Sequence, residues 1–148
     1  PQIEKSIWQN EREEARSKII TDSKFEAYAS DINPECVKIA KETAKHAGVY
    51  KHVKIFEKDA LTIATEGRRG TIVCNPPYGE RVYDKKEAED CYKDLGKVID
   101  GLDGWSLFAI TSAKNFEKCF GKKADRERKL YNSSKECRYY YYYGKKEK

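Results

Sequence analysis

Short apolar runs alternate with longer amphipathic segments along this chain. Apolar and β-branched runs predict strands at 25–30, 53–57, 71–74 and 105–111. Apolar side chains at helical spacing predict helices at 3–20, 34–47, 85–102 and 112–120. Two further strands, at 126–131 and 136–143, flank a four-residue loop and predict a β-hairpin. Alternation of strands and helices indicates one α/β domain over 1–148, with a mostly parallel sheet and an antiparallel hairpin at its C-terminal edge.

A run of five tyrosines, 139–143, falls in the last predicted strand. Side-chain alternation would bury one set of rings and expose the other. The exposed rings could form a ladder that stacks on bases, or the segment could be an edge strand with amphipathic rings. We favour the edge strand, because tyrosine suits a surface that is half apolar and half wet.

Composition narrows the class of protein. Charged residues make up 37% of the chain, hydrophobic ones 39%, and the formal net charge is +5, which permits contact with nucleic acid. No apolar run approaches the roughly 20 residues of a membrane span, and no signal peptide opens the sequence. The five cysteines show no C-x-x-C spacing. They indicate reduced thiols in a cytoplasmic protein, with neither a disulfide framework nor a metal site.

Acidic residues follow two of the predicted strands. Asp31 ends the strand at 25–30 and is followed by Asn33, a good N-cap, and Pro34, a good first helical residue. Asp59, followed by Ala60, stands in the same place after the strand at 53–57. An acid at the carboxyl end of a strand in an open α/β sheet lies where ligands bind, and its carboxylate can accept from both hydroxyls of a ribose. For Asp31, a helix-capping or solvated acid is the alternative.

The strand at 71–74 runs directly into a rigid corner. Pro76 and Pro77 have no backbone N–H, each fixes its own φ near −65°, and Pro77 restricts the residue before it. Asn75 precedes them, and Gly79 lets the chain turn away after them. The carbonyl groups of this corner therefore have few conformational choices.

The corner suits the recognition of an amino group on a base. The Asn75 side-chain oxygen can accept one N–H of an exocyclic NH₂, and the Pro76 carbonyl can accept the other. Two acceptors placed in this way draw the nitrogen toward tetrahedral geometry and free its lone pair for attack. Tyr78 offers a ring on which an extruded base can stack, worth about 1–3 kcal/mol.

Asn75-Pro76-Pro77-Tyr78 matches without substitution the motif of the S-adenosylmethionine-dependent amino methyltransferases. With the continuation through Arg81, the chain resembles the ribosomal RNA guanine-N2 methyltransferases whose longer members carry a THUMP RNA-binding domain. The resemblance implies a Rossmann-like class I methyltransferase fold that acts on guanine N2 of 23S ribosomal RNA.

The resemblance also implies roles for individual residues. The catalytic corner is Asn75, Pro76, Pro77 and Tyr78, and Tyr78 also binds the substrate. For Arg81 two readings stand: it binds the substrate by holding a backbone phosphate, or it is a surface or ion-paired arginine. The expected cofactor-binding residues are Asp31 on the ribose, Ile32 against the adenine, Asp59 on the adenine amino group, Ala60 and Asn75.

Three other functions fit the same motif or fold. An adenine-N6 DNA methylase carries the same four residues. Release-factor glutamine methyltransferases do as well, but an apolar residue usually follows their motif, whereas Gly79 follows it here. The third alternative is a catalytically silent nucleic-acid-binding module.

One expected feature is missing from the sequence. The resembled family binds the methionine end of its cofactor with a glycine-rich loop after the first strand, and this chain has no G-x-G loop. We therefore expect the first strand and this loop to lie in a preceding segment of a longer protein, together with an RNA-binding domain. The present chain would supply half of the cofactor site.

Overall fold

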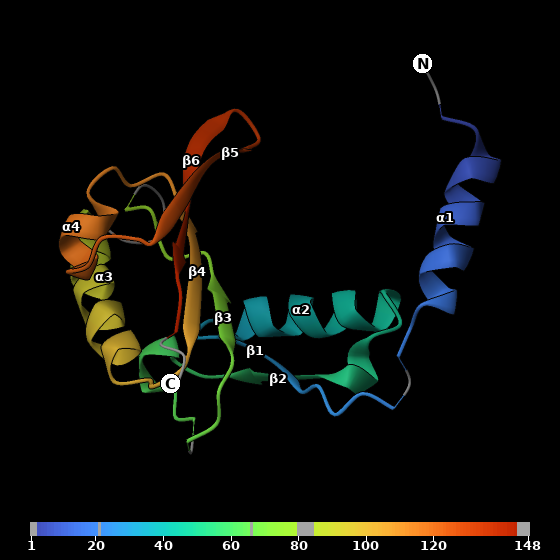
Figure 1. The fold of residues 1–148 in the computed structure, drawn as a ribbon, viewed down its shortest axis with the longest axis horizontal. Helices are drawn as coiled ribbons and strands as arrows, with labels where there is room; N and C mark the ends of the chain where they lie inside the picture. The colour runs from blue at the N-terminus through green and yellow to red at the C-terminus, as the bar shows by residue number, and fades with distance from the viewer. Residues whose placement is uncertain (1–2, 21, 66, 80–84, 145–148) are drawn as a thin grey trace.

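A computed structural model describes residues 3–20, 22–65, 67–79 and 85–144 (Figure 1). Each predicted helix and strand is present; the strands at 53–57 and 71–74 have the predicted ends, and the ends of the others are shifted. The elements are α1 (Lys5–Ser17), β1 (Ala27–Asp31), α2 (Pro34–His46), β2 (Val53–Glu57), β3 (Thr71–Cys74), α3 (Lys85–Asp100), β4 (Ser106–Thr111), α4 (Phe116–Phe120), β5 (Arg126–Asn132) and β6 (Lys135–Tyr142). Short 3₁₀ turns occupy Tyr50–His52 and Ala60–Thr62.

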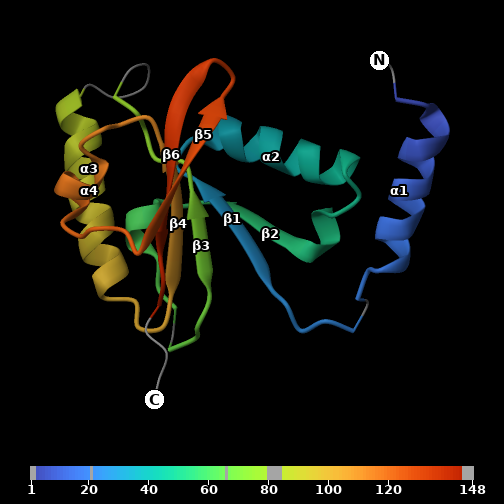
Figure 2. The ribbon, with the colours of Figure 1, turned by 45° about the horizontal axis from the view of Figure 1, so that its top comes forward.

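The described strands form two sheets rather than one continuous sheet. β1 pairs in parallel with β2, and the second sheet has the order β3-β4-β6-β5. In the second sheet β3 and β4 are parallel, whereas β6 runs antiparallel to both β4 and β5. Figure 2 shows β1 between β2 and β3, with no pairing from β1 to β3 among the described residues. The α/β class and the antiparallel C-terminal hairpin are confirmed.

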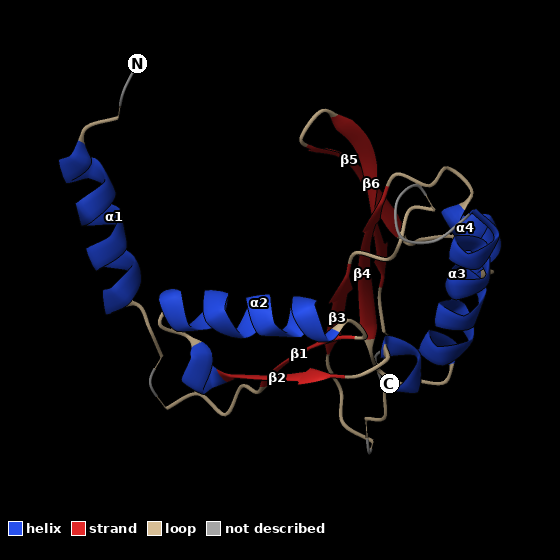
Figure 3. Cartoon of the chain, turned by 180° about the vertical axis from the view of Figure 1, so that it is seen from behind, coloured by secondary structure: helices blue, strands red, loops and turns tan. Residues whose placement is uncertain are grey.

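The core lies between the second sheet and helices α3 and α4, which cover one of its faces (Figure 3). Alternation along β4 places the fully buried Leu107 and Ala109 on this face. Gly96 lets the helices approach closely, because a Cβ there would lie 2.1 Å from the Phe120 carbonyl oxygen. The other buried members are Ala88, Tyr92, Leu95, Phe116, Phe120, Tyr140 and Tyr142.

The tyrosine segment corrects one prediction. β6 is not an edge strand, because it lies between β4 and β5, and β5 forms the edge. The alternation is as expected: Tyr140 and Tyr142 are buried, while Tyr143 is 51% exposed. The hairpin turn is also tighter than predicted, since Asn132 pairs with Lys135 and only two residues separate them.

Helix α1 lies apart from both sheets in Figure 1. None of its residues is buried, and Ile7 and Trp8 remain about half exposed at 51% and 53%. The amphipathic pattern predicted the helix correctly, but its apolar side contacts no core in the described part of the chain. No described helix is long and apolar enough to cross a membrane.

Candidate active site

The corner predicted from the sequence is open on one side and anchored on the other. Asn75 is exposed at the end of β3, Pro76 is buried, and Pro77 and Tyr78 are half-buried. Gly79 has φ of 77°, the left-handed conformation that turns the chain away. The Asn75 side chain is therefore accessible to a ligand, while the proline next to it is fixed in the protein.

A hydrogen bond connects the corner to the core. Tyr92, which is 1% exposed, donates to the Pro77 carbonyl oxygen. Burial raises the pKa of Tyr92, so its hydroxyl stays protonated and available as a donor. The Pro77 carbonyl is thus already engaged by a hydrogen bond from within the protein.

Tyr78 is held by the β5–β6 hairpin. The Cys137 thiol lies 4.0 Å from the Tyr78 hydroxyl. The Lys135 ammonium lies over the Tyr78 ring, 5.4 Å from its centroid. Burial is the main cause that raises the pKa of Tyr78.

The two predicted acids stand at the carboxyl ends of adjacent strands. Asp31 is the last residue of β1, and Asp59 lies two residues beyond the end of β2. One Asp31 oxygen accepts from the Asn33 amide at 2.8 Å, and one Asp59 oxygen accepts from the Leu61 amide at 2.9 Å. Asn33 caps α2, as predicted, by accepting from Glu35 at 2.9 Å. Both acids thus use one oxygen for local turns.

These residues are compatible with a nucleoside cofactor. Asp31 is exposed, and its second carboxylate oxygen has no partner within the described part of the chain. Ile32 is 59% exposed directly after it, which leaves an apolar side chain available beside the acid. Ala60 is exposed next to the half-buried Asp59. An accessible carboxylate with apolar neighbours matches the chemistry of a ribose and a purine ring.

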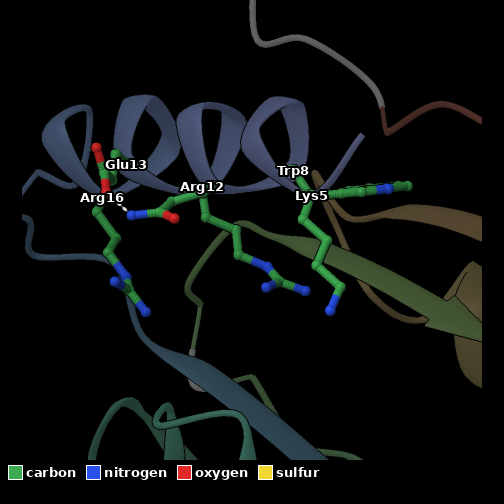
Figure 4. A pocket seen from close by; sticks show the side chains of 6 residues that line it. Lys5, Trp8, Arg12, Glu13 and Arg16 are labelled. Carbon is green, nitrogen blue, oxygen red and sulfur yellow. Dashed lines mark hydrogen bonds between the residues drawn. The ribbon is translucent and has the colours of Figure 1, made fainter. Parts of the chain in front are cut away.

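Arg81 and a depression along α1 do not belong to the described site at the strand ends. Arg81 falls outside the described residues. A shallow depression along α1 is separate from the strand ends, and Figure 4 shows Lys5, Arg12 and Arg16 extending to the same side of that helix. Among the described residues, no cluster of His, Cys, Asp or Glu could hold a metal ion.

Sequence patterns did not indicate the residues that anchor the corner. Tyr92 occupies an apolar position of the α3 stripe, and Lys135 and Cys137 belong to the hairpin. Each reaches the corner from at least 15 residues away in sequence. The one available signal was Tyr92 at an apolar position of a helix, because a buried phenol needs a hydrogen-bond partner elsewhere in the protein.

Comparison with known proteins shows the family of this chain. Residues 1–141 match the RMKL-like methyltransferase domain. The chain belongs to this family. The RMKL-like chain is 39% identical, over 97% of its length, to YpsC of Bacillus subtilis (strain 168), provisionally named an RNA methyltransferase. It is 33% identical, over 94% of its length, to ribosomal RNA large subunit methyltransferase K/L of Shewanella baltica (strain OS155 / ATCC BAA-1091).

Solved structures support the same assignment of the RMKL-like chain. SMU.472, a methyltransferase by its description and solved with SAH, superimposes over 100% of the chain with a TM-score of 0.86 at 32% identity. A protein described as a possible methylase from Clostridium difficile 630 gives the same TM-score, 0.86, at 41% identity over 99% of the chain. The RMKL-like chain thus has the expected fold of a methyltransferase domain.

The match covers only part of each relative. The RMKL-like chain spans 37% of YpsC and 20% of the K/L protein. It spans 39% of each of the two solved chains.

Proposed function

We propose that this domain transfers a methyl group from S-adenosylmethionine to the exocyclic amino group of an RNA base, specifically guanine N2 of large-subunit ribosomal RNA. The proposal rests on which hydrogen-bond acceptors of the corner are accessible. Asn75 is exposed, and the Pro77 carbonyl is already bonded to Tyr92. No hydrogen bond to the Asn75 side-chain oxygen or to the Pro76 carbonyl comes from the described part of the chain, so we assign these two acceptors to one NH₂ group.

The cofactor residues act by binding and orientation. Asp31 accepts from the ribose hydroxyls, Ile32 packs against the adenine, and Asp59 beside Ala60 accepts from the adenine amino group. Bound S-adenosylmethionine supplies an electrophilic methyl group. Both acids keep a second oxygen beyond the one used in their local turns, which supports this role.

The substrate residues prepare the amine. Asn75 and Pro76 each accept one N–H, which orients the nitrogen lone pair away from both acceptors. The rigid Pro76-Pro77 backbone keeps these acceptors in place, so little reorganisation accompanies the reaction. Tyr78 stacks on the base, and Arg81 holds a phosphate beside it. The proton leaves after the nitrogen has become cationic, so no strong base is required.

RNA is favoured over DNA and protein because of the relatives. YpsC and the K/L protein are both named for RNA, and the second for the large ribosomal subunit. Guanine N2 is the finer part of the proposal and comes from the resemblance of the sequence to that branch. Because ribosomal RNA is the proposed substrate, we also expect the protein to be cytoplasmic.

We further propose that the active enzyme is a longer chain with a preceding segment, including an RNA-binding domain. β1 and β3 each have an edge without a strand partner among the described residues. A strand from the preceding segment, inserted between them, would join the two sheets and bring its glycine loop to the cofactor. Backbone amides of β1 should exchange more slowly in the longer protein than in this chain alone. Equal exchange would contradict the insertion.

The substrate is tested with the longer protein and radiolabelled S-adenosylmethionine. Large-subunit ribosomal RNA, double-stranded DNA and a release factor are offered separately. We expect label in the RNA, and nucleoside digestion should recover it as N2-methylguanosine. Label only in DNA or in release factor would refute the RNA assignment, and label in a different RNA nucleoside would refute guanine N2.

A further inference from the structure

The tip of the β5–β6 hairpin contacts the stacking tyrosine of the corner at several points. Lys135 lies over the Tyr78 ring at 5.4 Å from the centroid, and the Cys137 thiol lies 4.0 Å from the Tyr78 hydroxyl. The hairpin is about 60 residues further along the chain, as the separation of 59 between Tyr78 and Cys137 shows. These contacts therefore come from tertiary structure, and the corner motif alone does not provide them.

The hairpin tip is built to hold these side chains in fixed positions. Asn132 and Lys135 are the last paired residues of the two strands, so the ladder fixes their separation. The turn between them includes Ser133 with φ of 56°. Cys137 is 1% exposed and belongs to the same strand as Lys135. The group over the Tyr78 ring and the group beside its hydroxyl thus both come from strand β6.

The position of Lys135 restricts how a base can approach. An ammonium group over one face of an aromatic ring occupies that face and is attracted by its π electrons. The opposite face is then the one available for stacking. A cation on one side also draws electron density from the ring, which favours stacking of an electron-rich purine on the other side.

We propose that Lys135 is a positioning residue for the target base: it fixes the plane of Tyr78 and leaves one face of the ring open. The inference rests on the proposed function in one respect, namely that the base stacks on Tyr78. The Cys137 thiol lies 4.0 Å from the Tyr78 hydroxyl, at the end of the ring that Lys135 does not cover. Lys135 covers the face that the base does not use.

The first test needs no substrate. The longer protein is labelled with 3-fluorotyrosine, and the ¹⁹F resonance of Tyr78 is identified by its loss in Tyr78→Phe. We expect Lys135→Met to shift this resonance and Lys135→Arg to restore most of its position. Lys129→Met is the matched control, because Lys129 lies over Tyr131 at the same 5.4 Å in the same hairpin. A Tyr78 resonance that Lys135→Met leaves unchanged would overturn the proposal.

The second test measures methylation of the RNA under steady-state conditions. Lys135→Met should raise KM for RNA about threefold to thirtyfold, the range of a cation–π contact, with kcat changed less than about twofold. Lys135→Arg should recover KM. In a Tyr78→Ala background, Lys135→Met should add less than about twofold. A full additional effect there would show that Lys135 contacts RNA directly and would overturn the proposal.

The two tests separate this inference from the proposed function. If the wild-type protein methylates none of the offered RNA, the proposed function fails, while the ¹⁹F measurement still decides whether Lys135 positions Tyr78. If RNA is methylated but Lys135→Met changes neither KM nor the resonance, the proposed function stands and this inference is overturned.

Discussion

Removal of the Tyr92 hydroxyl tests how the corner is anchored. In Tyr92→Phe the ring and its edge contact with Phe116, at 5.0 Å between centroids, are retained. The donor to the Pro77 carbonyl is lost. One neutral hydrogen bond is worth about 0.5–1.5 kcal/mol net, and a half-buried carbonyl left without its donor adds to the loss, so we expect about 1–3 kcal/mol of destabilisation.

Chemical denaturation of the longer protein measures this effect. With a slope of about 2 kcal/mol per molar urea, the midpoint should fall by about 0.5–1.5 M. The rate constant for methyl transfer should fall at least about tenfold, because a misplaced corner no longer presents its acceptors at the reacting distance. Both effects follow from the same lost hydrogen bond.

Tyr140→Phe is the matched control for Tyr92→Phe. Tyr140 is also buried, at 3% exposed, and stacks on the same Phe116 ring at 5.2 Å. Its hydroxyl has no hydrogen bond within the described part of the chain, so the variant should change neither the midpoint nor the rate appreciably. Wild-type stability and turnover in Tyr92→Phe, or equal losses in the two variants, would refute the anchoring role.

Two further predictions concern the cofactor acid and the buried thiol. Asp31→Asn keeps an oxygen that accepts from the Asn33 amide but removes the negative charge. Calorimetry should therefore show S-adenosylmethionine affinity reduced about ten- to hundredfold, while the free energy of unfolding changes little. Unchanged affinity would exclude Asp31 from the ribose site. Burial, with a smaller effect of Cys91, raises the pKa of Cys74 from 9.0 to about 12. Between those pH values the unfolded chain loses a proton that the native chain keeps, so the free energy of unfolding should fall as pH rises from about 9, and Cys74→Val should reduce this slope in urea titrations. An identical slope in the variant would contradict the burial of this thiol.

Local signals in the sequence were sufficient to predict the helices, the strands and the corner. Helical spacing, the cap at Asn33 and the glycines after α2 and α4 predicted these helices, and Gly48 and Gly121 do adopt positive φ of 74° and 85°. The corner could be predicted because proline geometry is local. The acids at the ends of β1 and β2 could be placed because they directly follow the strands.

Long-range pairing could not be predicted from the same signals. Periodicity does not give strand order, so the tyrosine segment was assigned to an edge although β6 lies inside the sheet. The segment 132–135 contains three turn-forming residues, and only cross-strand pairing shows that Asn132 and Lys135 belong to the ladder. The contacts of Tyr92 and Lys135 with the corner arise from packing between distant segments, for which the sequence contains no spacing rule.

The central claim is that Asn75 acts through an acceptor oxygen on the amine. It is tested most directly by single-turnover methyl transfer to large-subunit ribosomal RNA in the longer protein at saturating cofactor, with Asn75→Ala and Asn75→Asp compared with wild type. We predict that Asn75→Ala lowers the rate at least about a hundredfold, in the range of a lost transition-state hydrogen bond, while S-adenosylmethionine affinity changes much less. Asn75→Asp, which keeps an acceptor, should retain much more of the rate. An Asn75→Ala rate within about twofold of wild type would contradict the account.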